Sequence, residues 1–186
     1  VPLTIDTVAV TGTIIDDDRP VIEKIEPAPP TTPGAAPGSA PEGDDLVYTV
    51  TLSQPPAAAV TYPFSLGGGT ASGDDIGQPS FSNGVLLNSD GTITVPAGVA
   101  SFTVIVPTIQ DTRVETTESV PLTIDGVAVT GTIVDDDKAA VVFIEVVPPS
   151  APVPGLGAGE VVEGQTLTYR VQLNQATATE TVYPFE

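Results

Sequence analysis

The acidic residues of this chain fall in short runs whose carboxylates could together bind a metal ion. Histidine and cysteine are absent, so every candidate ligand is an oxygen atom. Oxygen ligands in flexible loops suit Ca²⁺, which takes about 6–8 of them, better than Mg²⁺ or zinc. The alternative is that these acids are solvated and serve only solubility. The runs are Glu42 with Asp44 and Asp45, Asp74 with Asp75, Asp111 with Glu115 and Glu118, and Asp135 with Asp136 and Asp137.

The composition argues against several classes of function. With 5 Lys+Arg against 24 Asp+Glu, the net charge of −19 disfavours binding to nucleic acid or to an anionic membrane surface. No apolar run approaches the roughly 20 residues that a membrane-spanning helix needs, so no membrane insertion is expected. The pair Glu115 and Glu118 could in principle hydrolyse a glycoside, but the chain has no Trp to build a sugar platform. We therefore expect no enzymatic activity.

Short alternating segments predict strands that would position these acids at strand ends and in loops. From Asp45 to Leu52 an apolar side chain occupies every second position, the pattern of a half-buried strand. Similar segments occur near residues 21–25, 59–65, 92–95, 101–106, 120–124 and 127–133. Six or seven short strands without a helical stripe indicate an all-β protein, an antiparallel β-sandwich. The Pro-rich stretch 27–41 is predicted to be a stiff loop.

The sequence also repeats itself. The block VPLTIDTVAVTGTIIDDD at 1–18 returns as VPLTIDGVAVTGTIVDDD at 120–137, and EGDDLVYTVTL from Glu42 is answered by EGQTLTYRVQL from Glu163. The spacing predicts a tandem array. Residues 1–18 would be the last hairpin of one repeat, 19–137 a complete repeat, and 138–186 the opening of the next. The triplet Tyr-Pro-Phe occurs at 62–64 and again at 183–185. It could form an exposed recognition patch, but a core role with a Pro-marked irregularity in the strand is favoured.

Each terminal fragment would lack the middle strands of a repeat and could not bury its apolar face alone. We expect these fragments to pair between molecules or to stay mobile. Unpaired, the second fragment would expose an apolar stripe formed by Leu167, Tyr169, Val171 and Leu173.

In order along the chain, EGDDLVYTVTLS, GGGTASGDDI, SFTVIVPTIQDTRVETTESVPLTI and TGTIVDDD resemble Calx-β-type domains. They look most like the Calx-β-like repeats of giant bacterial RTX adhesins that type I systems secrete. The resemblance covers the complete repeat and both partial ones, and it implies an immunoglobulin-like, Greek-key sandwich. Two positions depart from the pattern: Gln110 stands where the family often has Asp, and Ile76 replaces the usual Tyr. The implied calcium ligands are Glu42, Asp75, Asp111, Glu115, Glu118, Asp135, Asp136 and Asp137, with their counterparts Asp16, Asp17, Asp18 and Glu163.

The resemblance further implies a non-enzymatic, calcium-stabilised extender repeat outside the cell, on a bacterial surface. Such a repeat would be a rigid spacer that projects adhesive domains for cell adhesion or biofilm formation, and its partners would be the neighbouring repeats of the same polypeptide. Two alternatives stay open: a module that itself binds a glycan, a protein or a sister molecule, and a calcium-sensing hinge. The near-identical blocks favour the spacer, because a spacer needs no varied binding loops.

Overall fold

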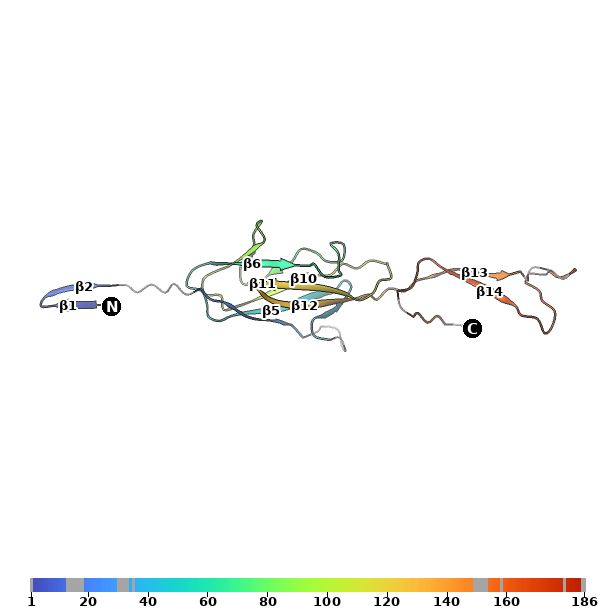
Figure 1. Ribbon diagram of the computed structural model, residues 1–186, viewed down its shortest axis with the longest axis horizontal. Helices are drawn as coiled ribbons and strands as arrows, with labels where there is room; N and C mark the ends of the chain where they lie inside the picture. The colour runs from blue at the N-terminus through green and yellow to red at the C-terminus, as the bar shows by residue number, and fades with distance from the viewer. Residues whose placement is uncertain are drawn as a thin grey trace.

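The protein is built from β-strands and turns. The computed structural model describes residues 2–12, 19–29, 34, 36–148, 154–157, 159–178 and 180–184. Figure 1 shows three groups of strands following one another along the long axis. The first is the hairpin of β1 (Pro2–Ile5) and β2 (Val8–Thr11), and the last pairs β13 (Val141–Val147) with β14 (Thr168–Leu173). Among the described residues there is no helix long and apolar enough to cross a membrane.

The middle group is a β-sandwich of two sheets. One sheet has four strands in the order β3-β5-β10-β7, and the other has six in the order β4-β12-β11-β6-β9-β8. The predicted all-β sandwich is therefore confirmed. The strands are β3 (Ile22–Pro27), β4 (Ser39–Pro41), β5 (Asp45–Leu52), β6 (Val60–Leu66), β7 (Ser80–Phe81), β8 (Leu86–Leu87), β9 (Thr92–Val95), β10 (Ser101–Pro107), β11 (Glu118–Ile124) and β12 (Val127–Val134).

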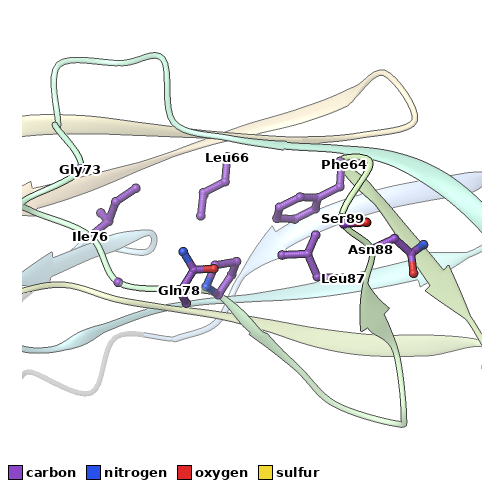
Figure 2. A pocket seen from close by; sticks show the side chains of 11 residues that line it. Phe64, Leu66, Gly73, Ile76, Gln78, Leu87, Asn88 and Ser89 are labelled. Atoms are coloured by element: carbon purple, nitrogen blue, oxygen red, sulfur yellow. The ribbon is translucent and has the colours of Figure 1, made fainter.

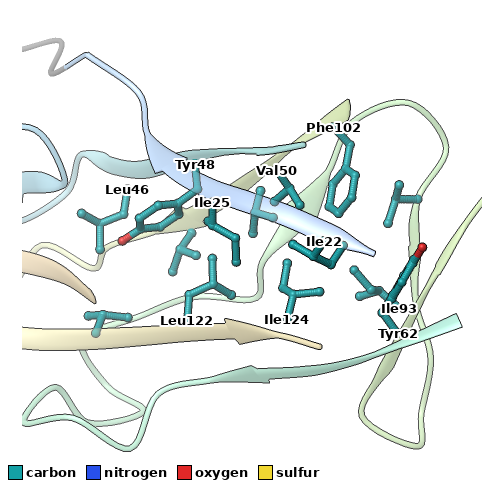
Figure 3. Packing of buried hydrophobic residues seen from close by; sticks show 14 of the residues in the cluster. Ile22, Ile25, Leu46, Tyr48, Val50, Tyr62, Ile93, Phe102, Leu122 and Ile124 are labelled. Carbon is teal, nitrogen blue, oxygen red and sulfur yellow. The ribbon is translucent and has the colours of Figure 1, made fainter. Parts of the chain in front are cut away.

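The period-2 pattern of the strands builds the core between the sheets. The four alternating apolar residues of β5 are all buried, and they share one cluster with Leu122 and Ile124 from β11 of the opposite sheet. Tyr48 and Tyr62 lie toward opposite ends of this core (Figure 3). The expected core role of the Tyr-Pro-Phe triplet is thus confirmed for Tyr62, while Phe64 is half-buried against the same core and Pro63 is exposed.

Three short strands were not predicted. The prediction of a loop over residues 27–41 is wrong at its end, where Ser39–Pro41 forms β4 and runs parallel to β12. Gly38 makes the turn into β4 with φ +77°, and its carbonyl accepts the N–H of Thr132 at 2.8 Å. A proline is tolerated here because β4 is an edge strand. Strands β7 and β8 have two residues each, too few to show alternation.

The terminal hairpins repeat the pairing seen in the sandwich. Strands β1 and β2 pair in the same register, residue for residue, as the matching part of β11 and β12. Strands β13 and β14 pair like β3 and β5, and they share the same irregularity. The register shifts between Ile22 and Lys24 in one hairpin and between Val141 and Phe143 in the other. The repeated sequence therefore forms the same strand pairing, bulge included, in both places.

The β3–β5 pair and the β13–β14 pair differ in whether a second sheet packs on them. Tyr48 and Val50 of β5 are fully buried, whereas their counterparts Tyr169 and Val171 of β14 are 57% and 53% exposed. Among the described residues no second sheet packs on β13 and β14. Of the expected apolar stripe, Leu167, Tyr169 and Val171 are therefore exposed, and Leu173 is half-buried.

Candidate metal centre

The acidic residues gather where β5 and β11 begin and β12 ends. A buried threonine, Thr108, fixes this region just after β10. Its N–H and hydroxyl both donate to the carbonyl of Asp44, at 3.1 and 2.7 Å, and the hydroxyl also lies 3.2 Å from the carbonyl of Pro41. The N–H of Glu42 donates to the carbonyl of Val134 at 3.2 Å. These bonds hold the turn before β5 against the last residue of β12.

The first group of carboxylates, which we name the terminal cluster, comprises Glu42, Asp135 and Asp137. One carboxylate oxygen from each lies within 4.8 Å of the others. Glu42 Oε2, Asp135 Oδ1 and Asp137 Oδ2 are all buried, and none has a hydrogen-bond partner among the described residues. Buried polar atoms are normally partnered, so three neighbouring carboxylates with such oxygens constitute a donor set that a hard divalent cation would satisfy.

The extended chain after β12 explains which aspartates take part. Successive side chains of an extended segment point to opposite sides, so Asp135 and Asp137 are half-buried while Asp136 is exposed. Asp136 instead accepts a hydrogen bond from Gln110 Nε2 at 3.1 Å. Gln110, one of the two residues that depart from the Calx-β pattern, thus contacts a carboxylate of the run.

Burial and mutual repulsion change the acidity of the terminal cluster. The pKa of Glu42 rises from 4.5 to about 7, chiefly because burial penalises its charged form. The charges of Asp111, Asp135 and Asp137 raise it further, against a hydrogen bond from the backbone of Asp111 that lowers it. The pKa of Asp137 is also raised, first by burial and then by the charge of Asp135. The cluster therefore favours a bound positive charge, whether a proton or a metal ion.

A second group, the loop cluster, consists of Asp75, Glu115 and Glu118, whose carboxylate oxygens also lie within 4.8 Å of one another. Thr70 and Ser119 bring its two segments together. The N–H of Thr70 donates to Ser119 Oγ at 3.0 Å, and the N–H of Ser119 donates to Thr70 Oγ1 at 2.8 Å. The hydroxyl pair thus ties the loop carrying Asp75 to the start of β11.

The negative charge of the loop cluster is already partly compensated by neighbouring groups. Burial acts to raise the pKa of Asp75, but hydrogen bonds from Ser72 and Glu118 outweigh it and hold that pKa below its ordinary value. Burial and the charge of Asp75 raise the pKa of Glu118. Arg113 Nε lies 3.3 Å from Glu115 Oε1. This cluster has a nearby arginine, whereas each member of the terminal cluster has an oxygen without a hydrogen-bond partner in the described part of the chain.

The structure thus brings together six of the candidate residues in two groups. Asp111 is exposed and accepts the N–H of Arg113 at 2.7 Å, but it lies close enough to act on Glu42. Glu163 is exposed and belongs to neither group. Asp16, Asp17 and Asp18 lie outside the described residues. The hydroxyl residues that position the clusters, Thr70, Ser72, Thr108 and Ser119, were not singled out from the sequence, because nothing distinguishes them there from other Ser and Thr residues.

A shallow groove on the sandwich is a separate candidate for ligand binding. Its volume is about 460 Å³. Phe64 and Leu66 of β6 line it together with Ile76 and Leu87, and Gln78 adds a polar group (Figure 2). None of its lining residues is charged, in contrast to the acidic end of the sandwich.

The raised pKa values predict how stability depends on pH in the absence of divalent cations. Between the ordinary pKa of Glu42, 4.5, and its folded value of about 7, the folded state binds more protons than the unfolded chain. The free energy of unfolding must therefore fall as pH rises through this window. Asp75 shifts in the opposite direction, but its ordinary value is 3.8, so its effect lies at lower pH.

We expect a lower melting temperature at pH 8 than at pH 5 when a chelator is present. Glu42→Gln should remove much of this difference. Glu23→Gln, which deletes the same charge from an exposed site, should retain it and so controls for the net charge of −19. A melting temperature that stays constant or rises over this range would contradict the assignment.

Comparison with known proteins identifies no family for this chain. No family profile matches the sequence, and no curated protein matches it. Domains 4 and 5 of the S-layer protein SbsC have a TM-score of 0.33 and 16% identity, covering 63% of this chain and 53% of that chain. Domains 4–9 of SbsC have a TM-score of 0.34 and 14% identity, covering 97% of this chain and 26% of that chain. The chain spans less than two thirds of either structure, and likeness of this degree carries no functional argument.

Proposed function

We propose that this chain is a non-enzymatic, calcium-stabilised repeat module of a bacterial surface protein. The observation that carries the proposal is the terminal cluster, with its three buried carboxylate oxygens that lack partners among the described residues. The extracellular location and the spacer role in an adhesin are supported by the sequence repeats and by the resemblance to RTX adhesin repeats.

Glu42, Asp135 and Asp137 would hold the calcium ion, with Asp111 nearby to add negative charge. A bound cation would cancel the repulsion that raises the pKa values of Glu42 and Asp137. It would also tie the turn before β5 to the segment after β12. The loop cluster of Asp75, Glu115 and Glu118 is the second candidate site.

The position of the terminal cluster suits a spacer. Asp137 is separated by three residues from β13, which begins at Val141, so an ion bound there would fix the direction in which the chain leaves the sandwich. Extracellular calcium modules have dissociation constants of about 10⁻⁴–10⁻³ M. Millimolar calcium outside the cell would fill the site, and micromolar calcium inside would not. The chain would thus be less stable before secretion and stiffer after it.

The competing hypothesis is a module that itself binds a ligand. The uncharged groove between Phe64 and Leu87 is a surface on which a neutral glycan or peptide would bind under this hypothesis. Screening the chain against glycans, with Phe64→Ala as the control, would distinguish the two functions, because the spacer requires no binding there.

The junction role is tested by removing the charges of Asp135 and Asp137. In the chain carrying Asp135→Asn and Asp137→Asn, we expect small-angle scattering in calcium to match that of the wild type in chelator, with a broader distribution of dimensions. The sandwich should stay folded, because both residues lie beyond β12. The matched control is Glu23→Gln with Glu26→Gln, which removes two charges from exposed positions of the edge strand β3 and breaks only the exposed ion pair of Glu26 with Lys24. Wild-type scattering that does not change between calcium and chelator would refute the role.

A further inference from the structure

The tyrosine of the second Tyr-Pro-Phe triplet, Tyr183, holds the segment that leaves the sandwich after β12 by a hydrogen bond. The hydroxyl of Tyr183 donates to the carbonyl of Ala139, a residue that is 1% exposed. The same contact occurs at the start of the sandwich, where the hydroxyl of Tyr62 donates to the carbonyl of Pro20 at 2.6 Å. In the repeat, Ala139 corresponds to Pro20 and Tyr183 to Tyr62. The contact is therefore a repeated feature.

A second pair of bonds is repeated next to the first. The N–H of Val21 donates to Ser53 Oγ at 3.1 Å, and the N–H of Ser53 donates to the carbonyl of Val21 at 2.9 Å. At the corresponding positions, the N–H of Ala140 donates to Asn174 Oδ1 at 2.8 Å, and the N–H of Asn174 donates to the carbonyl of Ala140 at 2.9 Å. Asn174 stands where the first copy has Ser53, yet its side-chain oxygen accepts the corresponding backbone hydrogen bond.

A basic residue precedes the gripped carbonyl in both copies. The Arg19 guanidinium lies 4.3 Å from the centroid of the Tyr62 ring and 3.1 Å from Asp125 Oδ1. The cation–π contact and the ion pair both hold the start of the complete repeat against the sandwich. Lys138 occupies the corresponding place between Asp137 and Ala139.

One contact crosses from the following segment to the sandwich. Gln175 Nε2 donates to the carbonyl of Thr112 at 2.8 Å. Thr112 lies in the loop between Asp111, beside the terminal cluster, and Glu115 of the loop cluster. The loop that carries Asp111, beside the terminal cluster, and Glu115 of the loop cluster is therefore also the surface that the next segment contacts.

We propose that the tyrosine of each Tyr-Pro-Phe triplet is a positioning residue of the junction between consecutive repeats. Through its hydrogen bond to the carbonyl of Ala139, Tyr183 fixes Ala139 to the following repeat, while Asp137 belongs to the preceding repeat. Lys138 is then the only residue between the two repeats. Such a short connection orients the next repeat so that its Asn174–Gln175 turn docks on the loop around Thr112. The acidic end of the sandwich thus binds the first strands and turns of the following repeat. The grip needs no cation.

Trypsin cleavage tests the proposal on the chain as it is, because it has only 5 Lys+Arg. Cleavage after Lys138 requires local release of the residues around it. Losing one neutral hydrogen bond should increase that release roughly three- to tenfold. We expect Tyr183→Phe to accelerate cleavage after Lys138 by this factor, in calcium and in chelator alike, and to leave cleavage after Arg113 and Arg170 unchanged. Gln175→Ala should accelerate the same site.

Tyr169→Phe is the matched control, because it removes a hydroxyl from an exposed ring in β14 of the same partial repeat. It should leave the rates of cleavage at all sites unchanged. Unaltered cleavage after Lys138 in Tyr183→Phe would overturn the proposal. Equal acceleration after Lys138 and Arg170 would also overturn it, since it would show that the tyrosine stabilises the hairpin rather than the junction. Failure of the calcium site would appear instead as cleavage after Arg113 that calcium does not slow.

Discussion

Calcium at about 5–10 mM is expected to raise the melting temperature of the sandwich by roughly 5–15 °C. At a free concentration of about 10–100 times the dissociation constant, each filled site adds roughly 1.4–2.7 kcal/mol to stability. One kcal/mol shifts the melting temperature of a domain of this size by about 3–6 °C. The terminal cluster should give most of the effect, since its oxygens lack partners among the described residues. Calorimetry with calcium and with chelator measures the shift.

Magnesium should give a smaller increase, because it demands a compact octahedral site and loses its water reluctantly. Asp75→Asn tests the loop cluster separately. It should reduce the calcium shift only in part, since the terminal cluster stays intact. Equal melting temperatures in calcium and chelator would rule out stabilisation by calcium.

Replacing Gly131 with Ala is expected to destabilise the sandwich by about 1–3 kcal/mol, the usual cost of overpacking a core. Gly131 lies in β12 against the side chain of Tyr48. A Cβ at this position would collide with the Tyr48 hydroxyl and come within 2.9 Å of Leu46 Cδ1. Both neighbours are buried in β5, so neither can move away freely. Gly73→Ala is the control, because a Cβ there would meet nothing within 4 Å.

Tyr48→Phe should rescue much of that loss. The Tyr48 hydroxyl is buried and has no hydrogen-bond partner among the described residues, and burial raises its pKa to about 12. Removing an unpartnered buried hydroxyl is nearly neutral, and it clears the space that the new methyl group needs. Chemical unfolding of the wild type, both single variants and the double variant gives the coupling energy. Strictly additive effects would show that the methyl group introduced by Gly131→Ala does not collide with Tyr48.

Alternation made the central strands predictable, and its absence hid the others. The apolar pattern from Leu46 to Leu52 predicted β5, because alternate side chains of a strand point to the core and these positions are the buried ones. Strand β4 was missed because its partner, β12, lies far away in sequence and because prolines dominate its surroundings. A parallel pairing of this kind depends on tertiary structure that no local pattern encodes.

The candidate ligands were predictable as a set, but their grouping was not. The sequence gathers Glu42, Asp75 and the acids near the end of the repeat without saying which of them meet. Only the direction of the chain after β12 separates Asp135 and Asp137 from the exposed Asp136. The grip of Tyr62 on Pro20 spans 42 residues and has no local signal, although recurrence of the Tyr-Pro-Phe triplet marked the residue.

Calcium titration by isothermal calorimetry, on the wild type and on Glu42→Gln, tests the central claim most directly. Glu42 joins the terminal cluster from the turn before β5, so its substitution removes one carboxylate without touching the segment after β12. We predict saturable binding to the wild type with a dissociation constant of about 10⁻⁴–10⁻³ M. In Glu42→Gln, binding at one site should weaken by at least roughly tenfold, the factor that about 1.4 kcal/mol represents. Calcium binding of equal strength and stoichiometry in the two proteins, or no binding by the wild type, would contradict the account.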